Sequence, residues 1–112
     1  MPNESSAGQS TAVFRIDRFV VPADAVPAFL ERLHHIQRTL GTLPGCRQNL
    51  VLTQKGGTGE SNMVTVVEWA SAQSMAAARA AVERIYAAEG FDPSAFMQKL
   101  GVRADLGVYS LA

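Results

Sequence analysis

The segment at positions 13–21 (VFRIDRFVV) constrains the fold more than any other part of the chain. It is rich in β-branched and aromatic residues, which favour a strand, and side chains on a strand alternate between its two faces. Both faces are apolar here: one carries Phe14, Ile16 and Val20, and the other carries Val13, Phe19 and Val21. A sheet that contains this strand must therefore be covered on both sides.

A helix is expected after this strand. Apolar residues recur at helical spacing from Val26 to Leu43, with Gln37 as the polar exception. Asp24 precedes this stripe as a predicted N-cap, and Pro44-Gly45 ends it. The stripe predicts a helix that packs against one face of the sheet.

Two strands, a long helix, a short helix and a last strand are expected in the second half. The strands are predicted at 46–55, 61–70 and 102–111, with a turn at 56–59. Ser71 opens an alanine-rich helix that should end near Gly90. The short helix is predicted to begin with Asp92 as N-cap and Pro93 in its first turn, and to end at Gly101.

This order of elements, βαββαβ, predicts an α+β, ferredoxin-like fold, in which a four-stranded antiparallel sheet has its helices on one face. The 112 residues suffice for one domain, placed at 12–112, and the small, polar stretch at 1–11 is expected to be a flexible N-terminal tail. Helices on one face leave the other apolar face bare. A second copy of the chain is the simplest cover for it, so we expect a homodimer.

Charge and cysteine content narrow the class of protein. Ten basic and ten acidic residues give a net charge of zero, so the composition predicts binding neither to nucleic acid nor to an anionic membrane. No apolar run approaches the roughly 20 residues that cross a bilayer, and the N-terminus lacks the pattern of a secretory signal. The single cysteine, Cys46, excludes an internal disulfide, and we expect a cytoplasmic protein.

Four short segments resemble a known family. They are Phe14-Arg15-Ile16-Asp17-Arg18-Phe19, Leu43-Pro44-Gly45-Cys46, Val66-Val67-Glu68-Trp69 and Ser71-Ala72-Gln73-Ser74-Met75. With them, the chain resembles the antibiotic biosynthesis monooxygenase family of the dimeric α/β-barrel superfamily. The resemblance implies a homodimer whose two sheets close a barrel, and a pocket between the sheet and the helices of each subunit. Family members include cofactor-independent oxygenases that convert anthrones to quinones, and haem-degrading enzymes.

The family's pocket residues can be compared one at a time. Trp69 matches the tryptophan that ends the third strand. The cofactor-independent oxygenases have an asparagine four residues earlier, where this chain has Thr65, and the nearby asparagine here is Asn62. The haem degraders have an asparagine on the first strand, where this chain has Asp17, and a histidine on the second helix that holds iron. Residues 71–90 contain no histidine, so neither haem nor another cofactor is expected.

Strand alternation and helical spacing place the candidate residues. Asp17, Thr65 and Trp69 line one cavity if their strand faces meet the helices; alternatively, Trp69 is a core residue and Asp17 pairs with an arginine. Arg79 lies near the apolar stripe of the second helix and reaches either the pocket or the solvent. Tyr86, on the same stripe, either contacts a substrate or packs in the core.

The remaining polar motifs predict no metal or phosphate site. His34 and His35 are adjacent, so on a helix they point about 100° apart, and the chain has no further histidine. The stretch at 56–61 (GGTGES) lacks the Gly-Lys-Ser/Thr ending of a phosphate loop and leads into a strand, so it predicts a hairpin loop.

The resemblance and the candidate residues together predict a cofactor-independent monooxygenase that acts on an aromatic or polyphenolic small molecule. The predicted catalytic residues are Asp17, Trp69 and Arg79, and the predicted substrate-binding residues are Thr65, Asn62 and Tyr86. The alternative is a non-catalytic dimeric α/β-barrel protein that binds a small ligand or has a structural role. RNA binding is not expected, because the third strand lacks the aromatic residues that RNA readers of this topology display.

Overall fold

The computed structural model describes residues 11–112, so the predicted tail at 1–11 lies outside the described residues apart from Thr11. In chain order the elements are β1 (Val13–Val20), the 3₁₀ turn η1 (Ala23–Ala25), α2 (Val26–Leu40), β2 (Cys46–Thr53), β3 (Met63–Trp69), α3 (Ala72–Glu89), α4 (Pro93–Leu100) and β4 (Arg103–Ser110). All the predicted strands and helices are therefore present, most with slightly shorter ends.

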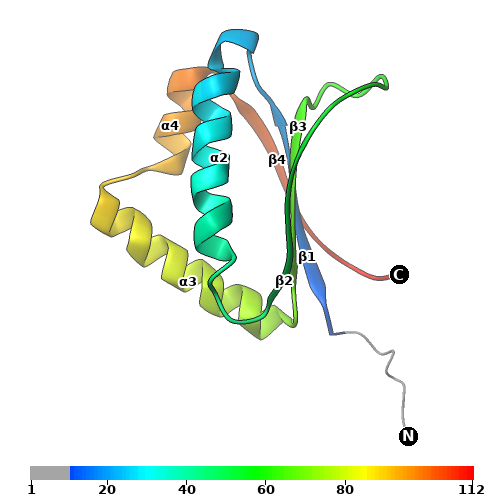
Figure 1. Ribbon diagram of the computed structural model, residues 1–112, viewed down its shortest axis with the longest axis vertical. Helices are drawn as coiled ribbons and strands as arrows, with labels where there is room; N and C mark the ends of the chain where they lie inside the picture. Colours follow the sequence, from blue (N-terminus) through cyan, green and yellow to red (C-terminus); the bar gives the residue numbers. More distant parts are fainter. Residues whose placement is uncertain (1–10) are drawn as a thin grey trace, which may run out of the picture.

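The strands form one antiparallel sheet in the order β2-β3-β1-β4. The central strand β1 places Asp17 opposite Thr65 of β3 and opposite Leu106 of β4. Helices α2, α3 and α4 all lie on the same side of the sheet (Figure 1). This arrangement confirms the predicted ferredoxin-like fold.

The signals at the helix ends are confirmed in α3 and α4 but not at the start of α2. Ser71 and Asp92 cap α3 and α4, and their side chains accept backbone N–H bonds of 3.0 Å and 3.1 Å respectively. The prediction that Asp24 caps α2 is wrong, because Asp24 lies inside η1 and Ala25 takes the N-cap position. Gly90 ends α3 in the left-handed conformation, with φ 66°.

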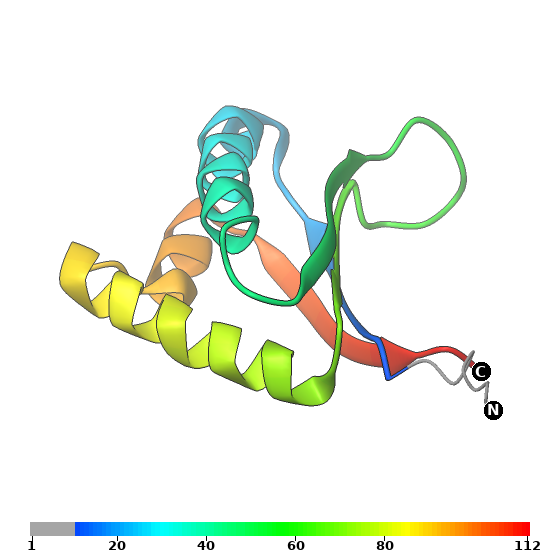
Figure 2. The same ribbon diagram turned by 60° about the horizontal axis from the view of Figure 1, so that its bottom comes forward.

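Two buried clusters hold the helices on the sheet. In the first, Phe29 of α2 is 3% exposed and meets Phe19 of β1 edge to face, with ring centroids 5.0 Å apart. In the second, Val67 and Trp69 of β3 pack against Ala78 of α3. Beyond this contact α3 runs outward from the strands (Figures 1 and 2). The second half of α3 therefore stands away from the sheet that its first half touches.

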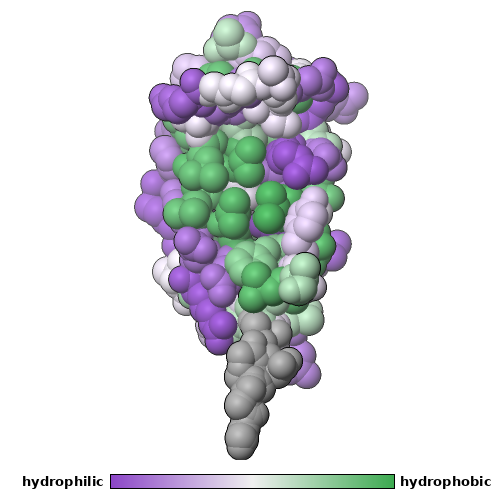
Figure 3. Space-filling view, turned by 90° about the vertical axis from the view of Figure 1, so that its right-hand side faces the viewer, coloured by the Kyte–Doolittle hydropathy of each residue, from purple (hydrophilic) through white to green (hydrophobic). Residues whose placement is uncertain are grey.

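No helix within residues 11–112 covers the opposite face of the sheet (Figure 1). We call it the bare face and define it by Phe14, Ile16, Leu50, Leu52, Val64 and Val66, which share this side in the strand register. Leu50 and Leu52 are 38% and 45% exposed. Figure 3 shows apolar side chains gathered in the middle of this face, with hydrophilic ones around them. The prediction that β1 is apolar on both sides is thus confirmed.

Candidate functional site

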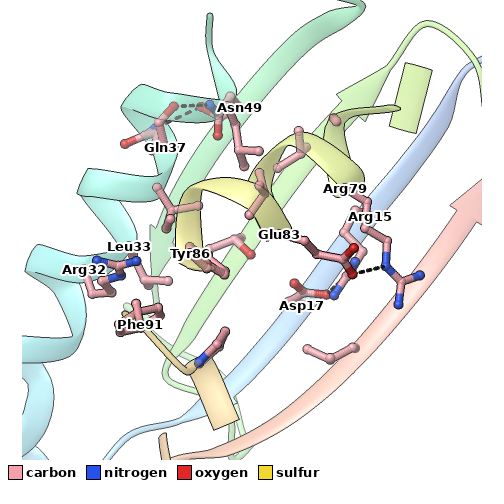
Figure 4. Close-up of a pocket in the computed structure, with 18 of the residues that line it drawn as sticks. Arg15, Asp17, Arg32, Leu33, Gln37, Asn49, Arg79, Glu83, Tyr86 and Phe91 are labelled. Atoms are coloured by element: carbon pink, nitrogen blue, oxygen red, sulfur yellow. Dashed lines mark hydrogen bonds and ion pairs between the residues drawn. The ribbon is translucent and has the colours of Figure 1, made fainter. Parts of the chain in front are cut away.

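A cavity of about 780 Å³ lies between the helix-facing side of the sheet and helices α2, α3 and α4. It forms where α3 diverges from the strands, and most of the side chains that line it are apolar (Figure 4). Pockets that bind small molecules typically have volumes of about 300 to 1,000 Å³ and a mainly apolar wall with a few polar groups. The cavity is therefore large enough for a molecule of several fused rings.

Three of the predicted site residues line this cavity together. Asp17 of β1, Thr65 of β3 and Trp69 of β3 all project from the helix-facing side of the sheet. Trp69 is only 3% exposed and also belongs to the second buried cluster. Both interpretations of Trp69 thus apply, since it is a core residue whose surface forms part of the cavity wall.

Asp17 is the acidic group in the sheet side of the cavity wall. Its Oδ1 accepts a hydrogen bond of 2.7 Å from Nε of Arg15, two residues earlier on the same face of β1. The Asp17 side chain is 16% exposed, and this burial raises its pKa above the ordinary value of 3.8, although the hydrogen bond and charge of Arg15 act against the rise. Asp17 therefore forms the predicted ion pair and still holds a proton more readily than an exposed aspartate.

Two predicted residues on α3 also line the cavity, in different environments. The Arg79 side chain is 76% exposed, and its Nε lies 3.7 Å from Oε2 of Glu83, one helical turn later. Tyr86 is half-buried, and its ring meets that of Phe91 edge to face at 5.1 Å. Burial raises the pKa of Tyr86, and the positive charge of Arg32 opposes that rise. Arg79 is thus a residue of the cavity rim and Tyr86 a residue of its interior.

Asn62 lies outside the cavity, which corrects its predicted place among the substrate contacts. Its side-chain amide accepts a hydrogen bond of 2.8 Å from the backbone N–H of Val21 and donates one of 2.9 Å to the backbone carbonyl of the same residue. Both polar atoms of the amide are therefore used to join the start of β3 to the end of β1. The physical reason is that Asn62 precedes β3, beyond the last register pair of the strands.

Arg32 is a site residue that the sequence pattern did not predict. Arg32 lines the cavity from α2, and its Nη2 donates to Oε1 of Glu89 at 3.0 Å. Its guanidinium carbon lies 3.4 Å from the ring centroid of Phe91 and 5.2 Å from that of Tyr86. The sequence feature that could have pointed to Arg32 is its spacing: it comes three residues after the buried Phe29, and residues three apart on a helix are neighbours on its surface.

Gln37 and Asn49 form a second polar pair that the sequence pattern did not predict. Gln37 Nε2 donates to the backbone carbonyl of Asn49 at 2.9 Å, and Asn49 Nδ2 donates to the backbone carbonyl of Gln37 at 2.7 Å. Figure 4 shows this pair at the edge of the cavity, between α2 and β2. The pair explains why Gln37 is the polar exception in the stripe of α2, since it fastens that helix to an edge strand.

Within residues 11–112, no group of three or more His, Cys, Asp or Glu side chains is arranged to hold a metal ion. The two adjacent histidines diverge: His34 is exposed, whereas Nε2 of His35 lies 3.2 Å from Oε2 of Glu89. In the same part of the chain, no helix combines the length and the apolar character that a membrane span requires.

Comparison with known protein families gives one match. The family model described as "Antibiotic biosynthesis monooxygenase" matches residues 12–89, which include β1, α2, β2, β3 and α3. A search of curated proteins finds no match.

Comparison with solved structures gives similar folds at low sequence identity. A proposed monooxygenase from Shewanella loihica PV-4 has a TM-score of 0.69 and 19% identity, with 92% of this chain and 96% of that chain covered. SnoaB, a cofactor-independent oxygenase from Streptomyces nogalater, has a TM-score of 0.61 and 16% identity, with 92% and 95% covered. A variant of MhuD with two manganese protoporphyrin IX molecules in each active site has a TM-score of 0.66 and 22% identity, with 88% and 93% covered.

Proposed function

The chain belongs to the antibiotic biosynthesis monooxygenase family, and we propose that it is a cofactor-independent monooxygenase acting on a flat aromatic or polyphenolic molecule. One observation carries the proposal: the cavity of about 780 Å³ has in its wall a carboxyl group, Asp17, whose pKa is raised by burial. A carboxylate with a raised pKa is a stronger base than an ordinary aspartate. SnoaB, a cofactor-independent oxygenase, shares this fold, which supports the same class of chemistry.

The reaction begins with removal of a proton from an acidic carbon of the ring system, with Asp17 as the base. The resulting carbanion is electron-rich and reacts with molecular oxygen to form a peroxide. Protonation gives the hydroperoxide, and loss of water leaves a new carbonyl group, so that CH₂ and O₂ become C=O and H₂O. The protein contributes an apolar wall that excludes water, with Trp69 and Thr65 against the rings and Arg79 as a positive charge at the rim.

The proposed enzyme is a homodimer that associates through the bare face. Exposed leucines on an uncovered sheet face favour burial against a matching surface, and a second copy offers the same surface. The free thiol of Cys46 is consistent with a reducing compartment, so we place the protein in the cytoplasm.

Oxygen uptake with an anthrone as substrate tests the proposed reaction. Asp17→Asn is expected to lower kcat about 100-fold or more, because it removes the base. Trp69→Phe is expected to raise KM, and Arg79→Gln to lower kcat by less than Asp17→Asn does. The matched control is Arg84→Gln, which removes an exposed arginine of the same helix that does not line the cavity.

The pH profile gives a second readout. The wild-type rate is expected to fall as the pH is lowered through the raised pKa of Asp17, above the ordinary value of 3.8, because the protonated carboxyl cannot accept a proton. Unchanged rates in Asp17→Asn and Trp69→Phe would remove both residues from the mechanism. Stabilisation by aromatic ligands with no oxygen uptake would instead favour the non-catalytic binding protein.

A further inference from the structure

The interior of the cavity holds a polar group that the proposed reaction has not used, the hydroxyl of Tyr86. Figure 4 shows Tyr86 between Arg32 at one end of the cavity and Asp17 at the other. The Tyr86 side chain is half-buried and lines the cavity. The polar group that interacts with its hydroxyl is the Arg32 guanidinium, which can only donate, so the hydroxyl proton itself is not used in that contact. A hydroxyl donor in an apolar wall normally finds a partner, so this group is available to a bound molecule.

The ring of Tyr86 is held in place by groups from two other segments. Phe91, in the connection between α3 and α4, packs edge to face on it at 5.1 Å. The Arg32 guanidinium from α2 lies over both rings, at 3.4 Å from the centroid of Phe91 and 5.2 Å from that of Tyr86. Because α3 stands away from the sheet at this end (Figure 2), these contacts, and not the sheet, hold the Tyr86 ring.

Arg32 is arranged to hold rings rather than to bind an anionic ligand. Its Nη2 is already bound to Glu89 at 3.0 Å, and the same carboxylate also lies 3.2 Å from His35. Its Nε is buried and meets no hydrogen-bond acceptor within residues 11–112. A guanidinium that gives up a hydrogen bond to lie on two aromatic faces gains cation–π attraction in exchange. Arg32 is thus a fixed support for Phe91 and Tyr86.

We propose that Tyr86 donates its hydroxyl proton in a hydrogen bond to a ring carbonyl or phenolic oxygen of the substrate, and that Arg32 is the positioning residue that aims it. This assignment rests on the proposed function and names the substrate class more closely: a ring system with an oxygen conjugated to the carbon that Asp17 deprotonates. Negative charge moves onto that oxygen as the proton leaves, so a donor there stabilises the anion. Burial raises the pKa of Tyr86, which keeps the hydroxyl protonated and able to donate at neutral pH.

Binding of two ligands that differ in one oxygen tests this proposal without turnover. The ligands are 1-tetralone, a ring ketone, and tetralin, the hydrocarbon of the same shape. Trp69 is the single tryptophan of the chain and lines the cavity, so its indole N–H signal in NMR titrations reports binding of either ligand. In the wild type, 1-tetralone is expected to bind about five- to tenfold more tightly than tetralin, as one hydrogen bond would give.

Tyr86→Phe is expected to abolish this preference while the Kd for tetralin stays within about twofold. Arg32→Met should reduce the preference as well, and Arg32→Lys should restore part of it, since a lysine keeps the charge but not the planar stacking. Arg38→Lys is the matched control, because Arg38 is an exposed arginine of the same helix that does not line the cavity. If Arg32 had a merely structural role, its substitution would weaken the binding of both ligands equally and leave the ratio of their Kd values unchanged.

The outcomes separate this proposal from the proposed function. No preference for the ketone in the wild type, or the same preference in Tyr86→Phe, overturns the role of Tyr86. If the preference depends on Tyr86 but an anthrone causes no oxygen uptake, the binding site stands and the oxygenase reaction falls. If oxygen uptake depends on Asp17 but not on Tyr86 or Arg32, the reaction stands and the positioning role falls.

Discussion

The two faces of the sheet are both apolar, but they hold their charges in different places. On the helix-facing side, the Arg15–Asp17 pair lies in the wall of a cavity, with side chains 34% and 16% exposed. On the opposite side, Arg18 and Asp105 form a pair of 2.9 Å near one edge, with side chains 43% and 71% exposed. The central residues of that face, Ile16 and Val66, are apolar neighbours.

This difference shows how one strand can contribute to two different surfaces. Arg15 and Asp17 alternate with Ile16 and Arg18 along β1, so successive residues belong to different surfaces. The proposed reaction needs a charged group in the cavity wall, whereas the proposed dimer surface needs an apolar centre with charges at its rim. Each face can therefore be altered by substitutions that leave the other face unchanged.

The largest effect is expected from a charge on the bare face. Val66→Asp introduces two carboxylates into a symmetric interface, because the substitution occurs once in each subunit. Dimerisation should weaken on the order of 10⁴-fold, or about 5 to 6 kcal/mol, since buried unpaired charge is strongly unfavourable. Sedimentation measurements across a concentration series check this, with Thr58→Asp in the exposed turn as the control. A wild-type protein that is monomeric throughout the series contradicts the proposed dimer.

A smaller but still large effect is expected under the helices. Phe29→Ala removes a ring that is 3% exposed and packs on Phe19, so it should lower the free energy of unfolding by about 3 to 5 kcal/mol. Leu111→Ala, at a side chain that is 66% exposed beyond β4, should change it by less than about 0.5 kcal/mol. Urea unfolding of both variants gives the comparison. An equal loss of unfolding free energy in both variants would contradict the difference in packing between the two regions.

The smallest effect concerns the charge in the cavity wall. Burial raises the pKa of Asp17 above 3.8 in the folded protein, so the folded state binds a proton more tightly than the unfolded state does. Protonation of Asp17 therefore stabilises the folded state. This stabilisation is present in full below the pKa of the unfolded state and is lost as the pH rises through the pKa of the folded state. At neutral pH, Asp17→Asn should therefore be more stable than the wild type by about 1 kcal/mol or less, because the pair is partly hydrated.

Urea unfolding of the wild type and Asp17→Asn between about pH 2.5 and pH 7 checks the sign. The difference should disappear toward the acid end of the series, where the aspartate is neutral in both states. A variant that is less stable at neutral pH would show that the attraction of Arg15 outweighs the burial of Asp17.

Interactions between residues close in the chain made several parts of the site and of the fold predictable. Period-two alternation placed Asp17, Thr65 and Trp69 on one side of the sheet, because a pleated strand leaves no other choice once the helix-facing side is known. Ser71 was recognisable as the start of a helix and Asp92 as a cap, because such side chains bind N–H groups only three residues away.

The missed residues depend on partners that are distant in the chain. The spacing of Arg32 after Phe29 indicates only which side of α2 it occupies. Arg32 belongs to the site because Tyr86 and Phe91 come to it from more than fifty residues later, and the spacing within α2 does not encode that approach. Asn62 was placed wrongly for a similar reason, since its partner is the backbone of Val21, 41 residues earlier. Such contacts depend on the angle at which whole elements pack.

The sequence by itself determined the order of the elements, the ends of most of them, and the division of β1 into two apolar faces, because these depend on interactions within a few residues. Only the tertiary structure decided that α3 diverges from the sheet and leaves a cavity of about 780 Å³. Only the tertiary structure decided that the Arg32 guanidinium reaches the Tyr86 ring at the far end of that helix. The physical reason is that a cavity and its polar lining arise from the packing of elements against each other, whereas a strand or a helix cap is specified by neighbouring residues.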